Sequence, residues 1–104
     1  MGYMVDSENR RRYERIALTK PVEATTSVGK QGGEIKDISA GGAAIVSHSP
    51  LKIKLGEPVE LRVENFGMVS GRVVRVDGHS DFAIAFDLDA NEALLVLDGI
   101  TKGS

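Results

Sequence analysis

The chain has 104 residues with a net charge of −2, 41% hydrophobic and 27% charged residues, and no cysteine. This length fits one domain with a modest core, and the composition argues against a disordered chain. The absence of cysteine excludes disulfides and thiolate metal sites, and the weakly acidic total disfavours a general DNA-binding protein.

Residues 1–9 are mostly small and polar, and we expect them to form a flexible lead-in. They lack the apolar segment of a secretory signal, and no apolar run in the chain approaches the ~20 residues of a membrane helix. We therefore expect a cytoplasmic protein without a membrane span. Four arginines follow within six residues, namely Arg10, Arg11, Arg12 and Arg15. Guanidinium groups suit phosphate and the acceptor edge of guanine, although a solvated basic arm is the alternative.

Six short segments with strand-like alternation come next, separated by turn-forming residues. The predicted strands are 22–28, 34–38, 43–46, 59–63, 69–76 and 82–86, with a glycine-rich turn at 29–33. In the second strand, the alternation predicts that Asp37 shares a face with Ile35. This pattern is typical of an all-β fold, and it predicts a six-stranded antiparallel barrel.

The period changes near the C-terminus, where a short helix is predicted. Asp89 and Glu92 have the spacing of a capping box, and apolar residues then recur at helical spacing. We expect Gly99 to end this helix and residues 101–104 to form a tail. The helix would cover one mouth or face of the barrel.

The segment from Asp37 to Gly42 lies between two predicted strands and contains two short polar side chains and two adjacent glycines. Adjacent glycines imply either positive φ or a backbone that another group approaches closely. An ordinary turn, in which Asp37 and Ser39 bond nearby amides, is the alternative. The only two histidines, His48 and His79, fall in predicted loops, so no metal site and no catalytic residue is predicted.

The arginine stretch and the aspartate turn together resemble the ligand signature of PilZ domains. The signature is Arg11-x-x-x-Arg15, followed after 21 residues by Asp37-x-Ser39-x-x-Gly42. The resemblance spans residues 8–100, and it implies a PilZ domain over 10–100. It further implies a non-enzymatic receptor for the bacterial second messenger cyclic di-GMP, which relays its signal to a partner protein that the sequence does not identify.

Cyclic di-GMP has two phosphates and two guanines, and both kinds of group fit the residue types of this motif. Arginine forks suit phosphate or the guanine N7 and O6 acceptors, and a carboxylate accepts from the guanine N1 and N2 donors. The expected ligand-binding residues are Arg10, Arg11, Arg12, Arg15, Asp37, Ser39, Gly41 and Gly42. The resemblance also implies that an arginine directly before the first motif arginine favours a ligand bound as an intercalated dimer. No cofactor is expected besides this ligand.

Two other functions are compatible with such a barrel. One is a protein–protein adaptor that keeps the PilZ fold and does not bind nucleotide, although the intact motif argues against it. The other is a single-stranded nucleic acid binder, which requires aromatic stacking platforms. The chain has only five aromatic residues, so this function is disfavoured.

Overall fold

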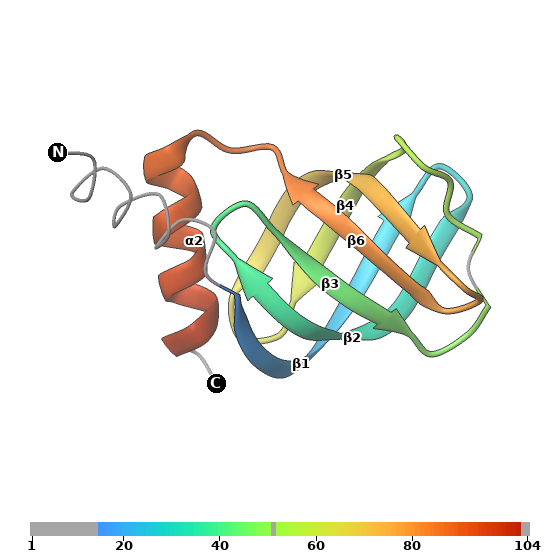
Figure 1. Ribbon diagram of the computed structural model, residues 1–104, viewed down its shortest axis with the longest axis horizontal. Helices are drawn as coiled ribbons and strands as arrows, with labels where there is room; N and C mark the ends of the chain where they lie inside the picture. Colours follow the sequence, from blue (N-terminus) through green and yellow to red (C-terminus); the bar gives the residue numbers. More distant parts are fainter. Residues whose placement is uncertain (1–14, 51, 103–104) are drawn as a thin grey trace, which may run out of the picture.

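Six antiparallel strands close into a barrel in the order β1-β2-β3-β6-β5-β4, and one helix follows them (Figure 1). The computed structural model describes residues 15–50 and 52–102. The strands are β1 (Ile16–Thr26), β2 (Gly29–Ser39), β3 (Gly42–Ser47), β4 (Pro58–Val63), β5 (Gly67–Asp77) and β6 (Asp81–Phe86), and the helix is α2 (Ala90–Lys102). The predicted six-stranded antiparallel barrel with a C-terminal helix is confirmed.

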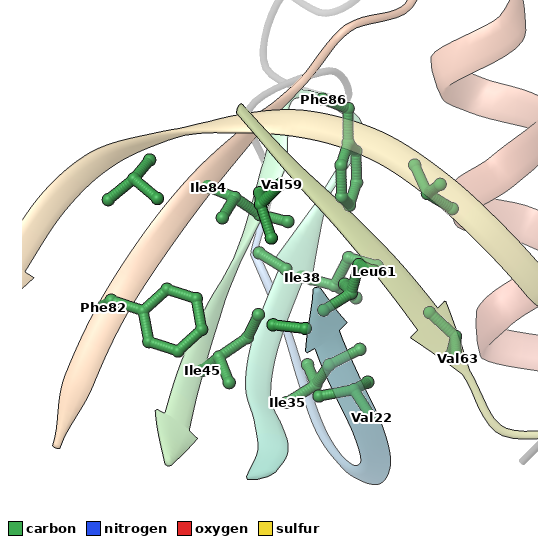
Figure 2. Packing of buried hydrophobic residues seen from close by; sticks show 14 of the residues in the cluster. Val22, Ile35, Ile38, Ile45, Val59, Leu61, Val63, Phe82, Ile84 and Phe86 are labelled. Carbon is green, nitrogen blue, oxygen red and sulfur yellow. The ribbon is translucent and has the colours of Figure 1, made fainter. Parts of the chain in front are cut away.

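Apart from the bulges, alternate side chains of the strands fill the barrel interior, as β4 illustrates. Val59, Leu61 and Val63 are buried to 2% exposure or less, whereas Glu60 and Arg62 between them are exposed. Figure 2 shows how the labelled apolar side chains from β1, β2, β3, β4 and β6 converge in the interior. Burying one such side chain contributes about 1.5–3 kcal/mol to the free energy of unfolding.

The turn of the first hairpin is shorter than the glycine-rich turn predicted at residues 29–33. Residues 29–33 belong to β2, and the turn consists of Ser27 and Val28, with Thr26 paired opposite Gly29. Val28, which the alternation predicts on the inward face, is therefore 62% exposed at the turn. Gly29 has a φ of 130°, which side-chain-bearing residues rarely adopt, so glycine permits this two-residue connection.

A β-bulge at Lys36 changes the direction in which the end of β2 faces. Between the pairs that Ile35 and Asp37 form with β3, β2 contains one residue more than β3. As a result, Ile35 and Ile38 both point into the core although they are three residues apart. The prediction that Asp37 shares a face with Ile35 is wrong, because the bulge turns the Asp37 side chain to the outer surface.

Helix α2 lies against one end of the barrel (Figure 1) and begins at the predicted capping box. The amide of Glu92 donates to Asp89 Oδ1 at 2.8 Å, and the amide of Asp89 donates to Glu92 Oε1 at 3.1 Å. Each of these two backbone donors thereby gains a partner, which stabilises the start of the helix. Within the described residues, no helix has both the length and the apolar content needed to cross a membrane.

The end of α2 packs closely on the barrel. The helix continues through Gly99 to Lys102, so the prediction that Gly99 ends it is wrong, and the first two residues of the expected tail are helical. Gly99 instead makes room for Phe66, because a Cβ there would lie 2.6 Å from the ring atom Cε1. The amine of Lys20, only 3% exposed, donates to the Ile100 carbonyl at 3.1 Å. A cation at a helix C-terminus is favourable, and this contact joins β1 to α2.

Candidate ligand site on the barrel surface

The barrel brings the two halves of the sequence motif together. Arg15 directly precedes β1, and Ala17 near the start of β1 pairs with Asp37 near the end of β2. Arg15 Nη1 donates to Asp37 Oδ1, although the two residues are 22 positions apart in the chain. Their side chains are 50% and 29% exposed, so the pair is open to solvent. Such a pair contributes only about 0–1 kcal/mol to stability, and either partner is available to a ligand.

The turn after Asp37 places Ser39 and Gly42 opposite each other. Ala40 and Gly41 form the connection between β2 and β3. Ser39 Oγ donates to the Gly42 carbonyl at 3.5 Å, which is long for a hydrogen bond. Among the described residues, Asp37 accepts no hydrogen bond from a turn amide, and its carboxylate accepts from Arg15.

The two glycines of the motif differ in what surrounds them. Neither glycine has a φ in the left-handed region. The other explanation predicted for adjacent glycines is a backbone that another group approaches closely. A Cβ on Gly42 would lie 2.0 Å from the Ile84 carbonyl oxygen, so glycine at this position allows β6 to approach β3. Gly41 is exposed, and the nearest atom to a Cβ there would be Ser39 Oγ at 4.0 Å.

The outer face beside the ion pair carries short side chains. Residues paired across antiparallel strands face the same side of the sheet. Asp37 pairs with Ala44 on β3, and Ala44 pairs with Ala83 on β6. In the next row, Gly42 pairs with Ala85. Figure 1 shows β2, β3 and β6 side by side on the near side of the barrel. We call Gly42, Ala44, Ala83 and Ala85 the small-residue face.

Two further ion pairs lie on the same side of the barrel as this face. Lys36 Nζ reaches Asp81 Oδ2 at 3.2 Å, and Arg75 Nε donates to Asp77 Oδ2 at 2.6 Å. Both pairs are solvent-exposed, so each contributes little to stability. In each pair the basic side chain is neutralised by a neighbouring carboxylate, whereas the side chain of Arg72 has no such partner among the described residues.

Arg72 on β5 is not among the predicted site residues, although it lies close to them. It pairs with Ala85, so its exposed side chain faces outward at the border of the small-residue face. Its Nη1 donates to the Gly56 carbonyl at 3.0 Å. Among the described residues it makes no ion pair with a carboxylate. The alternation of Arg72 with buried Val73 predicts that it faces outward, but only the order of strands in the barrel places it beside the motif.

The PilZ domain family matches residues 9–98 of this sequence. The chain belongs to the PilZ domain family. The solved PilZ domain of CeSA from a cellulose synthesizing bacterium is 26% identical, with a TM-score of 0.66 over 86% of this chain and 96% of that chain. The PilZ domain of YcgR from Escherichia coli, solved with c-di-GMP, is 15% identical, with a TM-score of 0.65 over 89% and 90% of the two chains.

The Borreliella burgdorferi PlzA protein, solved in complex with c-di-GMP, is a third similar structure. It is 20% identical, with a TM-score of 0.66, and the match covers 95% of this chain and 46% of that one. At these low identities the YcgR and PlzA structures establish the PilZ fold for this chain and nothing beyond it. No curated protein matches this chain.

The described part of the PilZ domain contains five of the eight predicted site residues. Arg15 and Asp37 are in contact, Ser39 and Gly42 are paired, and Gly41 lies at the turn between them. Arg10, Arg11 and Arg12 lie outside the described residues, so their predicted roles stay predictions. His48 and His79 are exposed in a bend and a turn, as predicted. Among the described residues, no group of histidine and carboxylate side chains could hold a metal ion.

Proposed function

We propose that this PilZ domain is a receptor for cyclic di-GMP. The observation that carries the proposal is the exposed Arg15–Asp37 pair, which stands beside Ser39 and the turn at Gly41. A fork of guanidinium donors and an acceptor-only carboxylate, side by side, complement a guanine that has acceptors on one edge and donors on another. The two similar PilZ-fold structures that hold c-di-GMP support the same choice of ligand.

Binding uses the groups that the pair already holds in place. Asp37 accepts from guanine N1 and N2, and Arg15 turns its free donors toward a phosphate or the guanine acceptor edge. Because the pair is exposed, opening it costs little free energy. Arg10, Arg11 and Arg12 then add charge-assisted contacts to the ligand, which is bound as a single molecule or as an intercalated dimer. The altered surface is read by a partner protein.

A calorimetric titration with cyclic di-GMP, with GTP as the control, tests the proposal. A PilZ-fold adaptor that does not bind nucleotide would give no binding isotherm with either compound. Cyclic di-AMP provides the specificity test, because adenine reverses the donor and acceptor pattern that Asp37 reads. A mispaired polar group costs about 1–3 kcal/mol, so we expect cyclic di-AMP to bind roughly 5- to 150-fold more weakly. Equal affinity for both dinucleotides would contradict the role of Asp37.

A matched pair of variants separates the role of Asp37 from a general effect of charge. Asp77 is also an exposed aspartate paired with an arginine, but it lies at the end of β5, before the turn to β6. We expect Asp37→Asn to lower the preference for guanine, since the amide keeps one acceptor oxygen but presents a donor in place of the second acceptor that guanine N1 and N2 require. Asp77→Asn should keep both the affinity and the preference.

A further inference from the structure

The proposed ligand consists of two identical halves, and both can contact the protein surface. Cyclic di-GMP carries two guanines and two phosphates, and the cluster of Arg15, Asp37 and Ser39 provides donors and acceptors for one half. In a ligand that is bound as a single molecule, the other half lies against a neighbouring part of the surface. Beside the motif, the outer face of β3 and β6 has no side chain longer than a methyl group at the four positions of the small-residue face. This path from Asp37 across β3 and β6 toward β5 crosses Gly42, Ala44 and Ala83, which are buried, and Ala85, which is half-buried.

Arg72 stands at the far border of this path. Its row of paired residues contains Ser39, Gly42 and Ala85, so it includes two residues of the ligand motif. Two strand spacings, roughly 10 Å, separate the backbones of Gly42 and Arg72. The Gly56 carbonyl that Nη1 binds lies in the loop before β4, so this bond holds Nη1 on the β4 side of Arg72, and the remaining guanidinium donors have no carboxylate partner among the described residues.

Arg75 is the other arginine at this border, and it is less suitable. It pairs with Ala83 and also faces outward, but its Nε already binds Asp77 at 2.6 Å. A guanidinium beside a carboxylate is partly neutralised, so it attracts an anionic ligand less. An uncompensated guanidinium has a stronger field for phosphate, and its planar fork can bind two oxygens at once.

We propose that Arg72 is a further ligand-binding residue of this domain, which contacts a phosphate in the half of cyclic di-GMP that lies farther from Arg15. This inference rests on the proposed function and extends its site from β2 across β3 and β6 to β5. It assigns to Arg72 a contact in addition to those proposed for the arginine stretch and the aspartate turn.

The test compares Arg72→Gln with Arg62→Gln in titrations with cyclic di-GMP at low and high salt. Glutamine at position 72 keeps an amide that can donate to the Gly56 carbonyl, and it removes the charge. Arg62 is a matched control, because it is exposed on β4 and also makes no ion pair among the described residues, but it neighbours β1 and the other side of β5. We expect Arg72→Gln to bind about tenfold more weakly or worse, and Arg62→Gln to bind like the wild type.

Salt dependence distinguishes a ligand contact from a structural role. Each lost attraction to a phosphate makes the affinity less sensitive to salt, so the Kd of Arg72→Gln should change less between the two salt concentrations than that of the wild type. A weaker affinity with an unchanged salt dependence would overturn the inference, as would wild-type affinity in Arg72→Gln or equal losses in both variants. Wild-type protein that binds no cyclic di-GMP would instead overturn the proposed function, and the inference with it.

Discussion

Gly41 and Gly42 are neighbours in the ligand motif, yet their surroundings predict opposite responses to substitution. A methyl group on Gly42 would overlap the Ile84 carbonyl oxygen, which belongs to the backbone of β6 and cannot move alone. We expect Gly42→Ala to lower the free energy of unfolding by roughly 3 kcal/mol or more, measured by urea denaturation. Gly41→Ala meets no atom closer than 4.0 Å and should stay within about 0.5 kcal/mol of the wild type. Similar losses in both variants would contradict this distinction.

Arg15 should matter for binding and hardly at all for folding. Its ion pair with Asp37 is half exposed, so Arg15→Ala should leave the free energy of unfolding within about 0.5 kcal/mol of the wild type. A charge-assisted hydrogen bond is worth roughly 1.5–3 kcal/mol, so the same change should weaken cyclic di-GMP binding about 10- to 150-fold. Arg15→Lys keeps the charge and loses the fork. Full affinity in Arg15→Lys would mean that charge alone suffices.

At the scale of residues, the motif predicted which side chains come into contact, but it did not predict the direction in which each side chain points. The sequence spacing of Arg15 and Asp37 identified the pair that the barrel brings into contact. Strict alternation placed Asp37 on the inward face, because it does not account for an extra residue in a strand. The signal was present in Ile35 and Ile38, two apolar residues three positions apart in a predicted strand, which only a bulge can place on one face.

At the scale of elements, hydrogen bonds to the Glu57 carboxylate connect the loop before β4 to the turn between β1 and β2. Ser27 Oγ donates to Glu57 Oε2 at 2.7 Å, and the Lys54 amide donates to Oε1 at 3.1 Å. These bonds, the Ser27 hydroxyl first, lower the pKa of Glu57 from its ordinary value because they stabilise the carboxylate.

A lowered pKa in the folded state links this contact to pH. The stabilisation is fully present above the unfolded pKa of Glu57, and it is lost as the pH falls through the lower folded pKa. We expect Ser27→Ala to move the pKa of Glu57 back up toward its ordinary value, as measured by NMR titration of the side-chain carboxyl. Thr25→Ala, a nearby change in β1 at a residue without a bond to Glu57, is the control. An unchanged pKa in Ser27→Ala would show that the backbone amide alone accounts for the shift.

The elements themselves were largely predictable, and the errors lie at their ends. Alternation located all six strands, and the spacing of Asp89 and Glu92 located the start of α2. Glycine is common in turns, so the glycine-rich segment 29–33 predicts a turn, but all five of its residues belong to β2, and at Gly33 the backbone of β3 approaches closely. Gly99 was taken for a helix end for the same reason, whereas its role is to contact Phe66. Long-range packing decides both cases, and local sequence does not encode it.

At the scale of the whole molecule, ligand binding should raise the melting temperature. A ligand that binds only the folded state stabilises it by about 2.7 kcal/mol at a free concentration 100 times its Kd. For a domain of this size, this corresponds to a rise of roughly 10–20 °C, measurable by calorimetry or differential scanning fluorimetry. Arg15→Ala should gain much less at the same cyclic di-GMP concentration. An equal rise with GTP would indicate stabilisation by any nucleotide.

The closed ring of strands limits how another protein can recognise this domain. Every described strand is bonded on both sides, since β1 pairs with both β2 and β4. Over the lengths where both neighbours are paired, no row of open backbone groups is left, and only strand ends such as residues 16–19 of β1 lack a partner on one side, so recognition by strand addition is disfavoured over most of the barrel. A partner is therefore expected to distinguish the domain mainly by its side chains. The same closure covers most of the strand edges from which sheets grow into fibres.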